Sequence, residues 1–245
     1  MKYLIFDAGP IISLTMNGML PIIEKLKSVF DGEFVLTPAV KREVVDRPMK
    51  IKKFKLEAMR VQDMIERGIF KMSGDIVEQG KLEREKKRIF KIANGVLRTT
   101  HGRKKMTIIH DGETASLAFA NLCGCENIIV IDERTTRMLT EAPGDLEKMM
   151  ERKLHTPLDA NLDLLKELKG FRFIRSAELL FVAWKKGLVM STRNSVPSKL
   201  GTSKEIPFSS GARNKDLLDA LLYGVKFKGC AISSGEIEDM KKLAS

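Results

Sequence analysis

Short hydrophobic runs, two of which end directly on an acidic residue, alternate with longer amphipathic segments along most of this chain. Residues 3–6 form one such run and lead into Asp7, and residues 34–36 and 128–131 form two more. Runs that are apolar throughout are typical of strands buried on both faces of a parallel sheet. Two shorter strands are expected at 69–72 and, at an edge of the sheet, at 171–174.

Between these runs, apolar residues recur at the spacing of amphipathic helices. After Asp111, the residues Ala115, Ala118, Phe119 and Leu122 lie at i, i+3, i+4 and i+7. Alternating strands and helices predict an α/β fold with a doubly wound, mostly parallel sheet. The other helices are expected at 11–26 with a break near Gly18, after Thr37-Pro38, at 50–67 and 75–94, from 134 onward, and at 156–168.

Residues 176–245 have a different pattern. A helix from Ser176 to 187 is followed by a polar loop at 191–212 and by two further helices, the second with a Ser233-x-x-Glu236 capping box. We therefore expect one domain at 1–175, with a basic helical insertion around 75–105, and a helical extension at 176–245.

The charge balance favours an anionic partner. Lysine and arginine outnumber the acidic residues and leave a formal net charge of +11. A surplus of this kind favours binding to a phosphate backbone, although a run of cations is also typical of a solvated helix face. The candidate phosphate contacts are Arg103, Lys104 and Lys105 in the basic insertion, together with Arg134 and Arg137 after the third strand.

The cysteine count and the hydropathy pattern indicate a cytoplasmic protein. Three cysteines cannot build a disulfide framework, and their use favours a reducing compartment. No apolar run approaches the roughly 20 residues that a membrane span needs. We therefore expect no membrane association.

Four acidic residues stand where a parallel sheet collects its functional groups. Asp7 and Asp132 directly follow two of the buried strands, Glu43 lies in the helix after the second strand, and Glu113 lies in the first turn of its helix. Ligands of open α/β sheets bind outside the carboxyl ends of the strands, near the switch in strand order. We expect these four side chains to converge there.

Clustered carboxylates favour a divalent cation. They raise one another's pKa unless a cation neutralises them, and Mg²⁺ and Mn²⁺ prefer hard oxygen ligands. Such ions activate water and stabilise the leaving oxygen in phosphodiester cleavage.

Each acid also has a structural interpretation. Asp111 is typical of a helix cap, with an auxiliary metal role as the alternative, and Glu113 could serve only the helix dipole. Asp132 and Glu133 compete for the fourth position, and Asp132 is favoured because it directly follows the strand.

Four segments together resemble the motifs of PIN-domain proteins of archaea and bacteria, and they occur in that family's order. They are residues 4–14 (LIFDAGPIISL), 35–44 (VLTPAVKREV), 111–118 (DGETASLA) and 129–134 (IVIDER). The resemblance spans about residues 1–175. Ala8 departs from it, because the family often has serine or threonine there.

The resemblance implies a three-layer α/β/α fold, frequent homodimerisation and Mg²⁺- or Mn²⁺-dependent ribonuclease activity. By motif position, Asp7, Glu43, Glu113 and Asp132 would bind the metal and position the water. RNA is the implied substrate, with single-stranded DNA as a second candidate. Family members include toxins paired with antitoxins and RNA-processing nucleases, and the length of this chain favours a processing role.

Three other functions compete with this one. A PIN-fold module could bind RNA with weak or no catalysis. A toxin paired with an antitoxin would need a small partner gene nearby. A phosphatase of the haloacid dehalogenase type needs a second aspartate two residues after the first, where this chain has Gly9.

Overall fold

The computed structural model describes residues 2–99, 106–124, 126–168, 170–189 and 215–244, and its centre is a five-stranded parallel sheet. The order β3-β2-β1-β5-β7 places β1 in the middle. This confirms the α/β class and the mostly parallel sheet that the sequence predicts. The strands are β1 (Tyr3–Phe6), β2 (Glu33–Leu36), β3 (Phe70–Met72), β5 (Asn127–Val130) and β7 (Phe173–Ile174).

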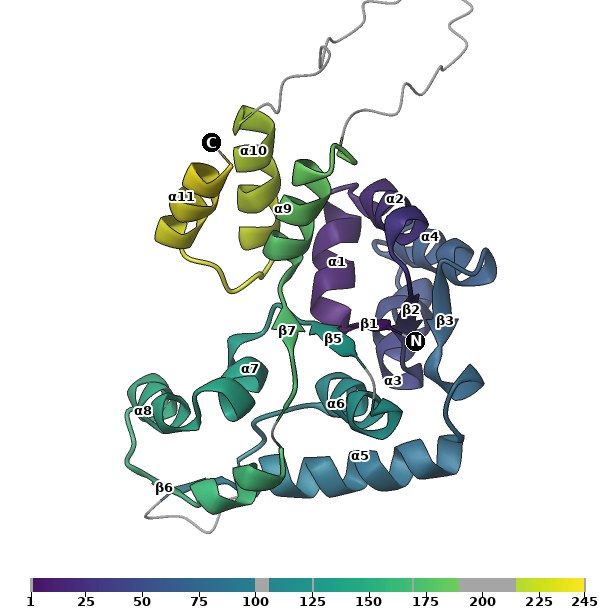
Figure 1. Ribbon diagram of the computed structural model, residues 1–245. Coiled ribbons are helices and arrows are strands. Elements are labelled where there is room, and N and C mark those ends of the chain that lie inside the picture. The colour runs from purple at the N-terminus through teal and green to yellow at the C-terminus, as the bar shows by residue number, and fades with distance from the viewer. Residues whose placement is uncertain (1, 100–105, 125, 169, 190–214, 245) are drawn as a thin grey trace, which may run out of the picture.

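Helices cover both faces of this sheet and complete a three-layer α/β/α arrangement (Figure 1). The α-helices are α1 (Ala8–Met16), α2 (Leu20–Val29), α3 (Pro38–Lys41), α4 (Lys55–Glu66), α5 (Gln79–Ala93), α6 (Asp111–Cys123), α7 (Arg134–Glu141), α8 (Pro143–Leu154), α9 (Ser176–Lys185), α10 (Lys215–Lys226) and α11 (Ser234–Leu243). Shorter turns are η1 (Arg42–Asp46, a π-helix) and the 3₁₀-helices η2 (Pro48–Lys50), η3 (Ser73–Asp75) and η4 (Leu162–Glu167).

The alternation of side chains along β1 divides the interior into two cores. Leu4 and Phe6 face a core shared with α1, α2, α4 and the C-terminal helices, whereas Tyr3 and Ile5 face the core of α5 to α8. Successive side chains of a strand point to opposite faces, so a strand that is apolar throughout needs cover on both sides. The three-layer packing supplies that cover.

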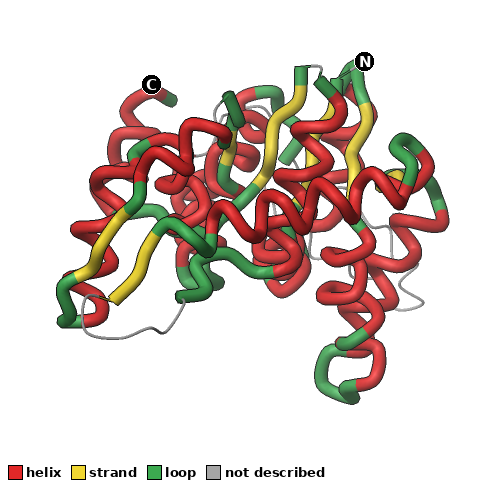
Figure 2. The backbone as a smooth tube through the Cα atoms, turned by 90° about the horizontal axis from the view of Figure 1, so that it is seen from below, coloured by secondary structure: helices red, strands yellow, loops and turns green. Residues whose placement is uncertain are grey.

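A second, two-stranded sheet corrects one prediction. The sequence pattern predicts a helix at 156–168, but this segment forms the strand β6 (Leu158–Ala160) and then the 3₁₀-helix η4. β6 pairs antiparallel with β4 (Leu97–Thr99), and Arg98 stands opposite Asp159 in the register. In the described part of the insertion around 75–105, α5 is followed by the strand β4, and Figure 2 shows this small sheet apart from the main one.

The Thr156-Pro157 pair resembles the start of a helix. The segment is a strand instead because β6 pairs with β4, which is distant in the sequence. Leu97 and Leu158 are buried in the same core as α5 and α8, and pairing of β4 with β6 satisfies backbone groups along the facing edges of the two segments. The strand pairing joins residues about sixty positions apart, which local periodicity does not report.

The C-terminal helices belong to the same core as the front of the chain. Leu179, Leu180 and Trp184 of α9 and Leu222 of α10 are buried in one cluster with Leu4 of β1. Figure 1 shows α9 and α10 beside α1. The extension predicted at 176–245 therefore packs through its described helices into the core on one face of the sheet, while the polar loop at 191–212 lies outside the described residues.

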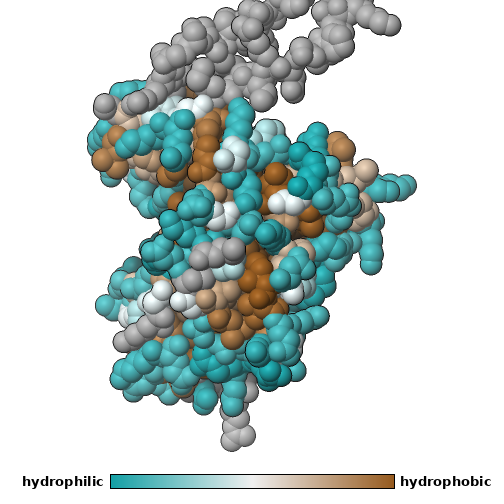
Figure 3. Space-filling model, turned by 45° about the vertical axis from the view of Figure 1, so that its right-hand side comes forward, coloured by the Kyte–Doolittle hydropathy of each residue, from teal (hydrophilic) through white to brown (hydrophobic). Residues whose placement is uncertain are grey.

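The surface view in Figure 3 is mostly hydrophilic, with separate areas of hydrophobic side chains between the polar ones. Among the described helices, none combines the length and the apolar composition that crossing a membrane requires.

Candidate functional site

Asp7 joins the central strand to the first helix. It directly follows β1 and is the N-cap of α1, where its side chain accepts a hydrogen bond from the Gly9 N–H at 3.4 Å. The strands β2 and β5 lie on opposite sides of β1, so the switch in strand order occurs at β1. The side chain is only 5% exposed. A buried carboxylate therefore stands where open α/β sheets bind their ligands.

Glu43 approaches Asp7 from the segment after β2. The Thr37 hydroxyl caps α3 by accepting a hydrogen bond from the Val40 N–H, and Pro38 occupies the first helical turn. The helix then widens into the π-helix η1, which carries Glu43. Single π turns within helices occur frequently at functional sites.

Glu113 is held by the start of α6. Its Oε2 atom accepts a hydrogen bond from the His110 N–H at 2.7 Å, which satisfies one free donor at the helix start. The preceding loop is tied to α5, because the Asn94 side chain accepts from the Ile109 N–H at 3.0 Å and donates to the Ile109 carbonyl at 3.1 Å. The helix-start role that is the structural alternative for Glu113 is present, and the other carboxylate oxygen is not used in that contact.

These three acids share one electrostatic environment. Burial and the negative charges of Glu113 and Glu43 raise the pKa of Asp7 to about 7, although the backbone N–H groups of Ala8 and Gly9 oppose the change. Burial and Glu113 likewise raise the pKa of Glu43, against the opposing charge of Arg47. The site therefore holds negative charge that the surrounding residues compensate only in part.

Asp111 belongs to the rim of this site. Its side chain is half exposed and forms ion pairs with Arg42 at 2.7 Å and Lys86 at 3.1 Å. Burial acts to raise its pKa, but the pairs with Lys86 and Arg42 hold the pKa of this carboxyl below its ordinary value. His110, and not Asp111, is the N-cap residue of α6. Asp111 thus links α6 to η1 and α5 by charge.

Asp132, the acid that follows β5 after one intervening residue, is bonded on both carboxylate oxygens. Oδ1 accepts from the Ser176 N–H at 2.8 Å, and Oδ2 accepts from the Ser176 hydroxyl at 2.8 Å and from the Ser13 hydroxyl at 3.3 Å. Its carbonyl accepts from the Ala231 N–H at 3.1 Å. Asp132 therefore joins β5 to α1, to the start of α9 and to the segment before α11.

The same surroundings explain a neighbouring thiol. Burial and the charge of Asp132 raise the pKa of the Cys230 thiol to about 12. A thiol with so high a pKa stays protonated and unreactive at neutral pH.

Glu133 serves as a helix cap. Its side chain is the N-cap of α7 and accepts from the Thr136 N–H at 2.7 Å. Asp132 and Glu133 compete for the fourth position of the site. Asp132 is buried near α1, whereas the side chain of Glu133 accepts a hydrogen bond at the start of α7.

Two glycines keep the space between the acids open. A methyl group added at Gly112 would lie 3.2 Å from Oε1 of Glu43 and 3.3 Å from Oδ1 of Asp7. One added at Gly9 would lie 3.8 Å from Oδ2 of Asp7 and 3.8 Å from Cβ of Asp132. A side chain at position 112 would therefore crowd the two acids from helix α6, and Gly9 lies between the ends of β1 and β5.

The donor set fits a hard divalent cation in its chemistry. Asp7, Glu43 and Glu113 offer carboxylate oxygens in a partly buried space that a glycine leaves free. Within the part of the chain that the structure describes, however, no three His, Cys, Asp or Glu side chains lie close enough together to hold a metal ion. The acids share one region, and their side chains would have to turn inward to bind one cation.

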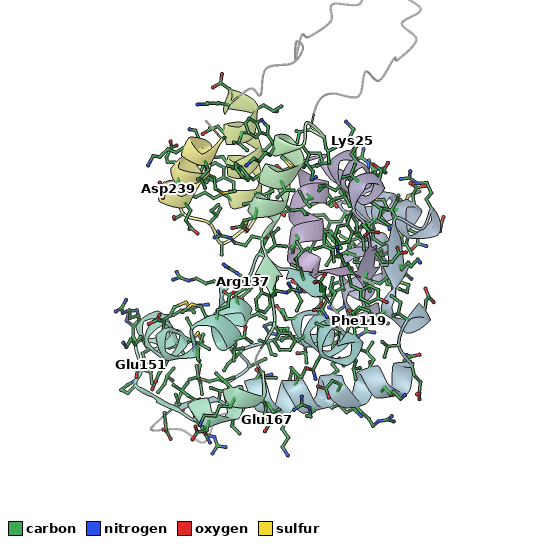
Figure 4. All side chains as sticks on the ribbon, viewed as in Figure 1. Lys25, Phe119, Arg137, Glu151, Glu167 and Asp239 are labelled. Carbon is green, nitrogen blue, oxygen red and sulfur yellow. The ribbon has the colours of Figure 1, made fainter. Side chains whose placement is uncertain are left out.

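The predicted phosphate contacts have separate surroundings. Arg134 is exposed at the start of α7. Arg137 lies on the side of α7 that faces the C-terminal helices (Figure 4), and its Nε atom is buried without a hydrogen-bond partner among the described residues. Arg103, Lys104 and Lys105 lie outside the described residues.

Sequence reasoning missed two parts of this arrangement. Gly9 and Gly112 each stand next to or near an acid at a helix start, and a glycine among such residues is the available signal for close approach. Ser176, which holds Asp132, lies far away in the sequence and carries no signal beyond its place at a helix start.

Comparison with protein-family models, with curated proteins and with solved structures finds no match to this chain.

Proposed function

We propose that this protein is a Mg²⁺- or Mn²⁺-dependent endoribonuclease of the PIN type. The observation that carries the proposal is Asp7, a buried carboxylate at the switch point of a parallel sheet with Glu43 and Glu113 as its charged neighbours. Burial of like charges costs free energy unless a ligand compensates it. The order of the four sequence motifs and the net charge of +11 support an RNA substrate.

The chain's own residues have distinct parts in this proposal. Asp7 and Glu43 would hold the cation across the space beside Gly112, and Glu113 would orient the attacking water through its free oxygen. A bound cation supplies water activation and stabilises the charge that develops on the leaving oxygen. Asp132 acts as a positioning residue, because its hydrogen bonds to Ser13 and Ser176 hold β5 and α1 in place beside Asp7.

The first experiment is a cleavage assay on fluorescent single-stranded RNA. The purified protein is incubated with Mn²⁺, with Mg²⁺ and with EDTA, beside an Asp7→Asn variant and an Asp31→Asn variant. Asp31 is an exposed acid at the turn before β2 and serves as the matched control. We expect metal-dependent cleavage that falls about 100-fold or more in Asp7→Asn and is unchanged in Asp31→Asn.

A catalytically weak RNA-binding module is the second candidate, and one observation favours it. Both carboxylate oxygens of Asp132 already accept hydrogen bonds, which leaves three acids for the proposed cation, and these three would have to turn inward to bind it. RNA binding without cleavage under all metal conditions would favour this module. Cleavage that persists at full rate in Asp7→Asn would mean that the site has been assigned to the wrong residues.

A further inference from the structure

A hydrophobic groove begins at the acid site and runs between α1 and the segment from η1 to α4. It has a volume of about 380 Å³, within the range of sites that bind small molecules. Its lining is almost entirely apolar and includes Ile12, Met16, Val44, Ile51 and Phe54. We call it the α1–α4 groove.

The groove is continuous with the acid site. Glu43 lines it, and the same side chain lies beside Gly112 and the Asp7 carboxylate. A chain whose phosphate lies at the three acids would therefore have its adjoining group at the mouth of this groove.

Several hydrophobic side chains of the groove are exposed to solvent. Ile12, Met16 and Ile51 are 44%, 38% and 48% exposed. A contiguous exposed apolar surface of this kind is more often a binding site than a surface without a function. Phe54 adds an aromatic ring, and the Lys53 ammonium lies 5.3 Å from the centre of that ring.

The segment that contributes Ile51, Phe54 and Glu57 to the groove is rich in cations, and we call these cations its basic rim. Arg47 lines the groove, and the residues that follow it contribute four exposed lysines, Lys50, Lys52, Lys53 and Lys55. Between these five cations and the carboxylates of the described residues there is no ion pair within 4.0 Å. An apolar groove with an aromatic ring and a basic rim is the combination that single-stranded nucleic acids recognise, through base stacking and phosphate contacts.

One polar group inside the groove indicates which base it would prefer. Glu57 lines the groove, and its Oε2 atom is buried with no hydrogen-bond partner among the described residues. Such an acceptor in apolar surroundings is costly unless a donor reaches it. Guanine presents two adjacent N–H donors on its Watson–Crick edge, which match the two oxygens of a carboxylate, whereas adenine, cytosine and uracil each place an acceptor next to their donor.

We propose that the α1–α4 groove binds an unpaired guanine base of single-stranded RNA next to the phosphate at the acid site. Phe54 stacks on the base, a small rotation of the half-buried Glu57 turns its free oxygen toward the base, and the basic rim holds the flanking phosphates. The inference rests on the proposed function for the position of the reacting phosphate, and it adds the base preference.

The test measures binding separately from cleavage. Fluorescence anisotropy in EDTA records the affinity of the full-length protein for a short oligouridine with one central guanosine, and for the same strand with inosine or adenosine there. We expect the guanosine strand to bind about 5- to 100-fold more tightly than the inosine strand, because inosine lacks the exocyclic amino group.

Three variants link this preference to the groove. Phe54→Ala should weaken binding of every strand by about 5- to 100-fold through lost stacking. Glu57→Gln should remove the preference for guanosine over inosine. Ile51→Ala changes only a half-exposed wall residue and should weaken binding less, so it keeps the test valid if Phe54→Ala does not fold.

Other occupants give different results. If the groove instead binds a second copy of the chain, sedimentation will find a dimer that an Ile12→Lys variant dissociates. If it binds an acidic amphipathic peptide, that peptide will bind more tightly than RNA and displace it. Either result, or RNA affinities that all three groove variants leave unchanged, overturns the inference.

The binding test and the cleavage test fail independently. Guanosine-selective binding in EDTA without cleavage in Mn²⁺ would support the groove and overturn the nuclease. Metal-dependent cleavage with no base preference, and with binding unaffected by Glu57→Gln and Phe54→Ala, would support the nuclease and overturn the groove.

Discussion

Asp7 and Asp132 stand at equivalent places in the fold, yet their surroundings are opposite. Each follows one of two neighbouring parallel strands, and both side chains are buried. Asp132 receives three hydrogen bonds from Ser13 and Ser176 on its carboxylate oxygens. Asp7 receives one long bond from Gly9 and faces two other acids.

The difference arises from what lies opposite each strand end. The start of α9 provides a backbone N–H and a hydroxyl that satisfy the acceptor oxygens of the buried Asp132 carboxylate. Beside Asp7 stand Gly112 and Glu43, so the adjacent space remains open and negative. One acid therefore contributes to folding, and the other is kept at a cost to stability that the proposed cation would offset.

The largest expected effect on stability comes from removing the Asp132 side chain, whose carboxylate oxygens accept hydrogen bonds. Asp132→Ala leaves the buried Ser176 N–H and hydroxyl without their acceptor, which should lower the free energy of unfolding by about 3 kcal/mol. Chemical denaturation measures the change. Glu133→Ala is the control at the next position, because it removes only the cap of α7 and should cost about 1 kcal/mol. Equal losses in the two variants would contradict the anchoring role of Asp132.

The opposite change is expected for Asp7→Asn, which should stabilise the metal-free protein above pH 7. The pKa of Asp7 is about 7 in the folded protein, against an ordinary value of 3.8, so the folded protein retains a proton that the unfolded chain releases. Stability therefore declines as the pH rises from about 4 to about 7, and asparagine removes this loss. The gain should be on the order of a few kcal/mol at pH 8 and should vanish near pH 4.

Thermal unfolding in EDTA across this pH range measures the gain. Mn²⁺ should then stabilise the original protein and have little effect on Asp7→Asn, since binding to the folded state alone raises its stability. A variant less stable than the original protein at pH 8 would show that Asp7 is satisfied in the same way as Asp132.

Gly112→Ala should have the smallest effect on stability, although it directly fills the space between the acids. The added methyl group would lie 3.2 Å from Glu43 and 3.3 Å from Asp7, so it intrudes between the two acids. Stability should change by no more than about 1 kcal/mol, whereas the affinity for Mn²⁺ should fall about 10- to 100-fold.

Calorimetric titration with Mn²⁺ measures the affinity of the Gly112→Ala variant. Gly144→Ala, in the first turn of α8 with open space around it, is the matched control and should leave the affinity unchanged. Unchanged affinity in Gly112→Ala would place the cation elsewhere.

Much of the fold is determined by local sequence. The apolar runs at 3–6, 34–36 and 128–131 became β1, β2 and β5 to within a residue, because strands covered on both faces need continuous hydrophobic residues. The capping residues Thr37 and Ser233 begin helices where their chemistry predicts, since their hydroxyls satisfy free N–H groups. Parallel strands also imply that Asp7 and Asp132 lie at one edge.

Only the tertiary structure distinguished those two acids and assigned the pairing of β4 with β6. Both depend on partners distant in sequence. Ser176 lies forty-four positions beyond Asp132, and α6, β5, α7 and α8 lie between Thr99 and Leu158. A local pattern specifies which residues are buried or helical, because those properties follow from spacing and propensity. Whether a buried carboxylate meets hydroxyl donors or other carboxylates depends on which segments pack against it, and so the fold decided which strand end could become a site.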